Sequence, residues 1–253
     1  MDTVQDIVRY SFGICSAYTA VRLKEQCKEP ICLYSDTKRE DEDTYRFGFE
    51  VAKKWNLNMV EASDGRDLWD VFRQENFIPH RKYNSCSVRM KIAPAEAWLK
   101  EFCGSANVWF GYDINEEDRA EKLLARWPHS NLTPRFMLME ESVTKAACFG
   151  FFQQHGIAPP SIYQHFQHAN CLPCKNYSEL DWQAFRYYYP EKFEDAQKLE
   201  TEDGLKWMFG DDRPYLKDLP MIDGAPSRKG RHRLPVNAPE FSFHMDCDAC
   251  AVD

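Results

Sequence analysis

Four of the ten cysteines in this 253-residue chain form two pairs with a spacing that metal sites use. Two residues separate Cys171 from Cys174, and two separate Cys247 from Cys250. Two thiolates at this spacing can reach one metal ion from a single tight turn. One such pair alone also fits a redox pair or chance, but two pairs favour a four-thiolate site for structural zinc or an iron–sulfur cluster. The simpler alternative is that the second pair belongs to a frayed tail.

A second group of residues could bind an anion. Residues 11–16, with the sequence SFGICS, lie between an apolar run and a segment with helical spacing of its apolar residues. A turn of small residues in that position exposes backbone N–H groups at a helix N-terminus, where phosphate binds well. Many strand–helix turns contain Ser and Gly, so this segment alone does not decide the function.

The elements that would position these groups follow from hydrophobic periodicity. Strands are expected at residues 7–11, 31–34, 57–61 and 107–112. Helices are expected at residues 16–27, 41–55, 67–74 and 92–102. This alternation predicts a parallel sheet with helices on both faces, which binds ligands at the carboxyl ends of its strands.

The second half of the chain is expected to be helical and rich in loops. One helix is predicted at residues 141–155 and another at 180–199, interrupted by Pro190, with mostly loop after Gly204. We therefore divide the chain into a nucleotide-binding α/β core, residues 1–125, and a C-terminal region, residues 126–253. The C-terminal region carries the cysteine pairs and completes the fold.

Composition excludes several classes of protein. The formal net charge of −8 opposes non-specific coating of nucleic acid, although residues 227–233 form a local basic segment. No apolar run reaches the roughly 18 residues that span a membrane. The first residues lack the basic and apolar parts of a secretory signal. We therefore expect a cytoplasmic protein without a membrane partner, with reduced or metal-bound cysteines. Composition leaves open whether the protein forms a homodimer.

The turn at residues 11–16 resembles the PP-loop of a nucleotide-binding superfamily, usually written SGGxDS. Ser11, Gly13 and Ser16 match that motif, and Phe12 matches the SFG form of its phosphoadenosine phosphosulfate reductase branch. Cys15 stands where many PP-loops carry Asp. The resemblance implies adenine-nucleotide binding by these residues on a Rossmann-like α/β fold.

Three later segments resemble the same family in the same order. They are LYSDT with EDTYRF at 33–47, CSVRMKIAP at 86–94, and FGYD at 110–113 with its downstream arginine. In the family these positions end a strand in DTG, open a helix with CCxxRKxxP, and place a glycine and an arginine beside the nucleotide. The further nucleotide-binding residues that the resemblance implies are Asp36, Thr37, Arg89, Lys91, Gly111 and Arg119. Of these, the two cations of the second segment could meet phosphate or sulfate.

Residues 156–174 resemble a segment of the adenylyl-sulfate reductases that ends in CxPC. In that family CxPC joins an upstream Cys–Cys pair around a [4Fe–4S] cluster. Here Cys86 remains of that pair and Ser87 replaces its neighbour, and the family's C-terminal ECGxH is absent. The pattern is closer to short reductase-like proteins, often encoded by phages, with a second CxxC at the C-terminus. The metal ligands that we expect are Cys171, Cys174, Cys247 and Cys250, with Cys86 in reserve.

These patterns predict a PP-loop enzyme that binds ATP, adenylyl sulfate or phosphoadenylyl sulfate. It would act in sulfur transfer or reduce an adenylylated sulfate, and a sulfur-donor protein would be a natural partner. If metal occupies both cysteine pairs, Cys15 or Cys86 becomes the candidate nucleophile. Two alternatives remain at this stage. One is ATP-dependent thiolation of nucleic acid, and the other is a nucleotide-binding module without catalysis.

Overall fold

The computed structural model describes residues 4–80, 85–209, 214–222, 224 and 226, and these contain a five-stranded parallel sheet. Its strands in chain order are β1 Gln5–Arg9, β2 Ile31–Tyr34, β3 Asn58–Glu61, β4 Ala106–Trp109 and β5 Leu132–Arg135. They lie in the order β3-β2-β1-β4-β5, so the chain builds outward from β1 on one side and then crosses to its other side. The carboxyl ends of β1 and β4 therefore form the switch point at which such sheets bind ligands.

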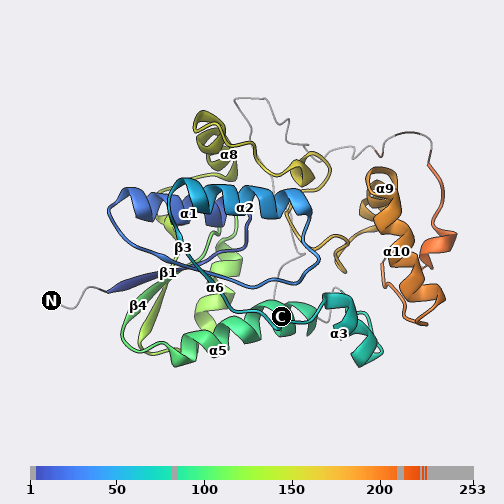
Figure 1. Ribbon diagram of the computed structural model, residues 1–253, viewed down its shortest axis with the longest axis horizontal. Helices are drawn as coiled ribbons and strands as arrows, with labels where there is room; N and C mark the ends of the chain where they lie inside the picture. Colours follow the sequence, from blue (N-terminus) through green and yellow to red (C-terminus); the bar gives the residue numbers. More distant parts are fainter. Residues whose placement is uncertain (1–3, 81–84, 210–213, 223, 225, 227–253) are drawn as a thin grey trace.

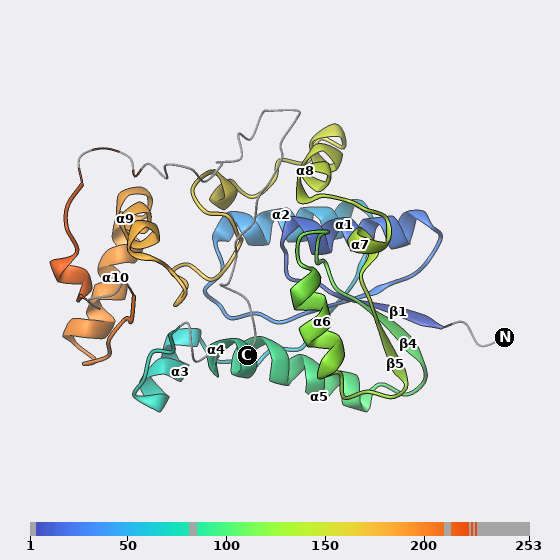
Figure 2. The ribbon, with the colours of Figure 1, turned by 180° about the vertical axis from the view of Figure 1, so that it is seen from behind.

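Helices cover both faces of the sheet, as the sequence predicted (Figures 1 and 2). On one face lie α1 Ile14–Glu25, α2 Glu42–Lys54 and α8 Lys145–Gln154. On the other lie α5 Ala93–Glu101 and α6 Glu117–Ala125, whereas α3 Leu68–Glu75 lies beyond the end of the strands and packs with the C-terminal helices. The central strand β1 is buried on both sides, with Ile7 and Val8 fully inaccessible. An α/β fold with a parallel, doubly covered sheet is confirmed.

The sequence interpretation missed β5. This strand contains Pro134, which lacks the N–H that a central strand needs, and it pairs only with β4 at the edge of the sheet. Edge positions tolerate proline. The sheet therefore takes its last strand from beyond residue 125, the predicted limit of the nucleotide-binding core.

The helix predicted at residues 141–155 was wrong at its start. The chain forms a short helix, α7 Met137–Glu140, and then a turn in which Ser142 has a φ of +54°. Thr144 caps α8 by accepting a hydrogen bond from the Ala147 N–H. The helix predicted at 180–199 is divided into α9 Glu179–Tyr188 and α10 Pro190–Thr201, because Pro190 takes the first position of a new helix.

The C-terminal helices have a core of their own at one end of the sheet (Figure 1). Trp182, Phe185 and Trp207 are buried there together with Leu68 and Phe72 of α3. These apolar contacts fasten the C-terminal helices to α3. They thereby fix the position of the loop that carries the first cysteine pair.

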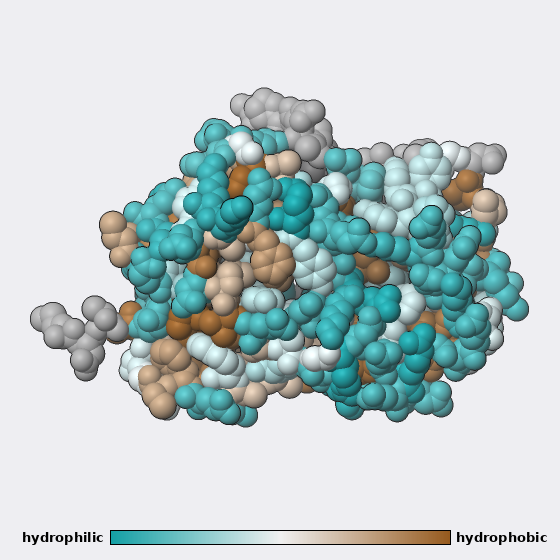
Figure 3. All heavy atoms as spheres, viewed as in Figure 1, coloured by the Kyte–Doolittle hydropathy of each residue, from teal (hydrophilic) through white to brown (hydrophobic). Residues whose placement is uncertain are grey.

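Short helical segments complete the described chain: α4 Ser85–Ser87, the π-helix η1 Val88–Ile92, and the 3₁₀ turns η2 Ser161–Gln164 and η3 Leu216–Asp218. Hydrophilic residues cover most of the face drawn in Figure 3, and the hydrophobic ones are interspersed among them. Within the described residues, the helices are all too short or too polar to span a bilayer.

Candidate functional site

A cavity of about 390 Å³ lies at the carboxyl ends of β1, β2 and β4. Arg9 and Tyr10 line it from the end of β1, Ser35 from the residue after β2, and Phe110 and Gly111 from the residues after β4. The loop before α1, η1 and the loop that follows η2 close its sides. The cavity thus occupies the switch point of the sheet, where the topology predicts a ligand.

Hydrogen bonds close the loop at residues 11–16 on itself. The Ser16 hydroxyl accepts from the Ser11 N–H at 3.1 Å and donates to the Gly13 carbonyl at 2.9 Å. The Tyr163 hydroxyl accepts from the Ile14 N–H at 3.3 Å. The loop leads directly into the twelve-residue helix α1, whose positive N-terminal end therefore faces the cavity. Because such a turn favours an anion such as phosphate, we call residues 11–16 the phosphate-binding loop.

Phe12 anchors this loop to the hydrophobic core through its buried ring. Its φ of +57° is unusual for a residue with a side chain, and its ring is buried within 5.4 Å of the Tyr10 ring and 5.1 Å of the Tyr34 ring. A Cβ atom on Gly48 would stand 1.9 Å from Phe12 Cδ1, so α2 must carry glycine there. Phe12 lines the cavity as predicted, but its aromatic ring packs into the core and does not face a nucleotide.

Gly111 allows the chain after β4 to touch the start of α1. A Cβ atom at Gly111 would lie 2.5 Å from the Ser16 nitrogen and 2.8 Å from the Cys15 carbonyl carbon. Both neighbours are backbone atoms of the first turn of the helix, so a side chain has no room. Gly111 thus sets the position of the phosphate-binding loop by its lack of a side chain.

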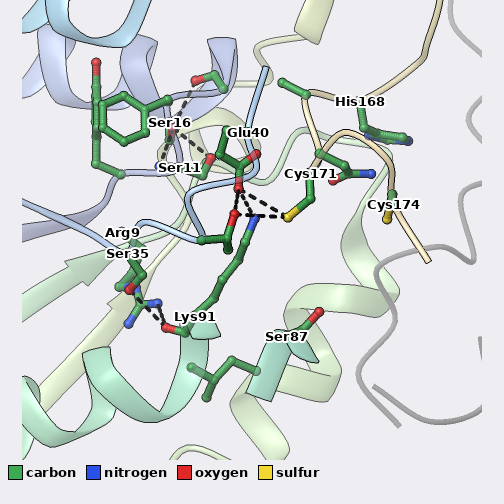
Figure 4. Close-up of a pocket in the computed structure, with 18 of the residues that line it drawn as sticks. Arg9, Ser11, Ser16, Ser35, Glu40, Ser87, Lys91, His168, Cys171 and Cys174 are labelled. Atoms are coloured by element: carbon green, nitrogen blue, oxygen red, sulfur yellow. Dashed lines mark hydrogen bonds and ion pairs between the residues drawn. The ribbon is translucent and has the colours of Figure 1, made fainter. Parts of the chain in front are cut away.

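The π-helix η1 presents Lys91 to the cavity. The Lys91 carbonyl accepts hydrogen bonds from the Arg9 guanidinium at 3.1 Å and from the Ser35 hydroxyl at 3.2 Å. These bonds attach the widened turn to the ends of β1 and β2. The Lys91 ammonium lies 2.7 Å from Glu40 Oε1, as Figure 4 shows. π-turns are rare and often occur at functional sites.

Glu40 is the centre of a small polar cluster. Its Oε1 also accepts from the Thr37 hydroxyl at 3.2 Å and lies 3.5 Å from Cys171 Sγ. Thr37 Oγ1 is in turn 3.3 Å from that sulfur. The Glu40 side chain is only 4% exposed, and its Oε2 has no hydrogen-bond partner among the described residues. Glu40 was missed in the sequence because a single acidic residue in a loop belongs to no motif.

The cluster controls the charge of its members. Burial by itself lowers the pKa of Lys91, but the facing Cys171 and Glu40 together raise that pKa well above its usual value. Burial, followed by the charge of Glu40, raises the pKa of Cys171 well above its usual value, and Lys91 opposes this only in part. The arrangement therefore favours a charged Lys91 ammonium next to the Glu40 carboxylate.

The cavity is locally cationic although the chain is acidic. Five Lys or Arg side chains and three Glu side chains line it. Lys145 is 6% exposed, and its ammonium donates to the Gln167 carbonyl at 2.7 Å. Burial lowers the pKa of Arg9 to about 10, a shift that Glu96 opposes in part. Buried cations that face neutral oxygens favour an anionic ligand. Arg9 and Lys145 stand outside the recognised motifs, so the sequence alone did not reveal them.

Most of the predicted nucleotide-binding residues line this cavity. They are Ser11, Phe12, Gly13, Ser16, Thr37, Lys91, Gly111 and Arg119. Asp36 and Arg89 are not among the lining residues. The Asp36 carboxylate instead accepts from the Lys38 N–H at 2.7 Å and from the Tyr45 hydroxyl, and Arg89 pairs with Glu75 at 2.7 Å. Two residues apart on a helix, Arg89 and Lys91 point in different directions.

Cys15, Cys86, Cys171 and Cys174 also line the cavity. Burial raises the pKa of Cys86, which is 9% exposed, as it also raises the pKa of Cys171. Within the described part of the chain, no three His, Cys, Asp or Glu side chains gather around a common point. Cys247 and Cys250 lie outside the described residues. The zinc or iron–sulfur site stays a prediction.

Comparisons with known proteins agree with the motifs. The family model described as "Phosphoadenosine phosphosulfate reductase domain" matches residues 5–177. A 70-residue segment is 33% identical to an uncharacterized protein of Methanocaldococcus jannaschii and covers 28% of this chain and 16% of that protein. The chain thus matches only a small part of that relative's length.

Two solved structures resemble the chain at low identity. The phosphate complex of phosphoadenylyl-sulfate reductase from Candida auris gives a TM-score of 0.46 at 14% identity, over 63% of this chain and 77% of that one. NH3-dependent NAD synthetase from Campylobacter jejuni, in complex with a nitrate ion, gives 0.38 at 13% identity, over 81% and 87%. The family model, in contrast, matches residues 5–177, which are more than half of the chain. The protein belongs to the phosphoadenosine phosphosulfate reductase domain family, within the nucleotide-binding PP-loop proteins.

Proposed function

We propose that this protein is an enzyme that binds an adenine nucleotide and acts in sulfur transfer or in the reduction of an adenylylated sulfate. One observation carries the proposal. The phosphate-binding loop at residues 11–16 and the thiol of Cys171 face the same cationic cavity. A phosphate held at the start of α1 would therefore share one cavity with a sulfur atom.

In this proposal, different groups around the cavity bind the phosphate, meet the reacting end of the nucleotide and take the thiol proton. The loop before α1 binds phosphate through its backbone N–H groups, and Lys145 adds positive charge beside it. Lys91 meets the anionic group at the reacting end of the nucleotide, next to Cys171. Glu40 lies 3.5 Å from Cys171 Sγ, close enough to take the thiol proton. Family membership supports the nucleotide, and the cavity supports the thiol chemistry.

The steps above use only this chain's own acid, base and thiol groups. A zinc ion or an iron–sulfur cluster at Cys171, Cys174, Cys247 and Cys250 is a separate proposal, because the two tail cysteines lie outside the described residues.

Nucleotide binding is tested at Gly13. A Cβ atom there would lie 3.3 Å from Ser11 Oγ and 3.5 Å from the Tyr163 hydroxyl, so alanine fits tightly but without a severe clash. Gly13→Asp adds a negative charge where phosphate would bind. Calorimetry should show that Gly13→Asp weakens ATP binding well beyond tenfold, about 1.4 kcal/mol. Gly13→Ala, the steric control, should weaken it much less. Equal affinities in the wild type and a folded Gly13→Asp variant would rule out this loop as the phosphate site.

The products identify the reaction. With adenylyl sulfate or phosphoadenylyl sulfate and a dithiol as electron donor, reduction releases sulfite and the nucleoside phosphate. With ATP and a thiolation substrate, adenylation releases pyrophosphate and then AMP. Nucleotide binding without release of sulfite, pyrophosphate or AMP would leave the alternative of a binding module without catalysis. Cys171→Ser should abolish sulfite release and retain ATP binding, since its sulfur contacts Glu40 and not the loop.

A further inference from the structure

One wall of the cavity, distant in sequence from the phosphate-binding loop, is built around a carboxylate. Glu96 of α5 lines the cavity, and its Oε2 lies 2.6 Å from His129 Nε2. The His129 side chain is only 6% exposed, so its contact with Glu96 is largely shielded from solvent. Among the described residues, the recorded hydrogen bond of the Glu96 side chain uses Oε2 alone. Oε1 is left as an acceptor on the cavity side.

Aromatic rings continue this wall. The His129 ring lies 5.1 Å from that of Trp127, and Trp127 lies 5.8 Å from Phe110 at nearly a right angle. Phe110 is 5.7 Å from Tyr112. Trp127 is held in place because its indole N–H donates to the Leu132 carbonyl of β5 at 2.8 Å. Trp127, Phe110 and Tyr112 all line the cavity.

A guanidinium closes the far end of the wall. Arg119 Cζ lies 4.3 Å from the Tyr112 ring centre, and Arg119 pairs with Glu116 at 2.5 Å. Its cation is thus stacked on an aromatic face and held by a carboxylate, so its plane has a defined orientation. Fixed rings between an acceptor carboxylate and an oriented guanidinium suit a flat heterocycle with N–H and ring-nitrogen groups on its edge.

We propose that this wall binds a nucleobase, with the ring against Trp127 and Phe110 and an N–H group of its edge donated to Glu96, because Phe136 and Arg119 already stack on Tyr112. Glu96 and His129 would then decide which base is accepted. Adenine presents an exocyclic amine as a donor, whereas a 6-oxopurine presents at that position a carbonyl oxygen that the carboxylate repels. The base has two sources: the nucleotide that the phosphate-binding loop holds, in which case the inference rests on the proposed function, or a second molecule bound beside it.

The test compares three probes by calorimetry on the full chain: ATP, tripolyphosphate and free adenine. Glu96→Gln keeps the size of the side chain but replaces an acceptor oxygen by an amide that donates. Loss of a hydrogen bond to a charged group should weaken ATP binding about tenfold or more. Tripolyphosphate, which lacks a base, should bind the variant as it binds the wild type. Glu101→Gln is the matched control, because it makes the same change on an exposed part of α5.

Adenine added to ATP-saturated protein separates the two sources. If the Glu96→Gln variant binds ATP more weakly and adenine does not bind beside ATP, the wall binds the base of the bound nucleotide. If ATP binding is unchanged but adenine binds beside ATP and is lost in Glu96→Gln, the wall serves a second molecule. Trp127→Leu should reproduce either loss through the ring contact, and thermal melting checks that each variant is folded.

The inference and the proposed function fail in different ways. If the wild type binds neither ATP nor tripolyphosphate but binds adenine in a Glu96-dependent manner, the proposed function is wrong and base binding by this wall is supported. Unchanged ATP and adenine affinities in both Glu96→Gln and Trp127→Leu would refute the proposal that this wall binds a base. Wild-type protein that binds neither adenine nor ATP overturns it as well.

Discussion

Replacing Gly111 by alanine should disturb stability and nucleotide binding together. The added Cβ would stand 2.5 Å from the Ser16 nitrogen and 2.7 Å from the Ser16 Cα. Comfortable contacts between heavy atoms begin near 3.5 Å, so the start of α1 must move by roughly 1 Å. The obstacle is backbone inside a helix, which cannot rotate away as a side chain would. The phosphate-binding loop is continuous with that turn and must move with it.

The cost follows from comparable overpacking. Inserting a methyl group into a filled site destabilises a protein by about 1–3 kcal/mol. For a chain of this size, that corresponds to a fall in Tm of roughly 2–12 °C. ATP affinity should fall about tenfold or more, since displaced N–H groups no longer converge on the phosphate. Thermal melting and calorimetry measure the two effects on the same sample.

Gly150→Ala provides the matched control. Gly150 lies within α8, and a Cβ atom there would meet nothing within 4 Å. The same substitution should therefore stabilise the protein by about 0.5–1 kcal/mol through helix propensity and leave ATP binding unchanged. If Gly111→Ala melts and binds ATP like the wild type, the close approach of α1 to the end of β4 does not exist as described.

Three further outcomes are expected. Tyr163→Phe removes the acceptor of the Ile14 N–H and should lower the free energy of unfolding by about 1–3 kcal/mol in urea titrations; an unchanged midpoint would contradict it. Burial raises the pKa of Glu200 above its unfolded value near 4.5, so the folded state holds that proton more tightly and wild-type stability falls as pH rises above that value. Glu200→Gln should lack this part of the slope in denaturation series over pH, and an identical slope would refute the assignment. The double variant Cys247→Ser, Cys250→Ser should lose its zinc or iron stoichiometrically by metal analysis, and full retention would exclude the tail cysteines as ligands.

Local patterns were sufficient to predict four strands of the sheet and the turn between β1 and α1. Strands that alternate with helices leave few arrangements, and the SFG turn lies immediately between β1 and α1. Residues 11–16 therefore occupy a position that the topology alone assigns to ligands. The edge strand β5 was missed because Pro134 and the short run around it resemble a loop in sequence.

The contacts that complete the cavity could not be predicted, because they join residues far apart in the chain. Glu40 reaches Lys91 across 51 positions, and Tyr163 reaches Ile14 across 149. Lys145 is a buried cation at the first position of a helix, where sequence reasoning expects an exposed residue. The packing of α8 against α1 places Lys145 at the cavity, and the hydrogen bond between Tyr163 of η2 and the Ile14 N–H holds η2 against the start of α1. The direction in which Arg89 points depends on the π-turn, which has no reliable sequence signature.

That π-turn makes the number of residues between Cys86 and Lys91 a geometric constraint. Each residue of an α-helix rotates the chain by about 100°. Deleting one residue from Val88–Ile92 would close the widened turn to ordinary α pitch and move the Lys91 side chain and carbonyl relative to Cys86. The thiol and the ammonium could then no longer face the same cavity, and the Lys91 carbonyl would lose its bonds to Arg9 and Ser35. Substitutions within the turn should be tolerated more readily than any change in its length.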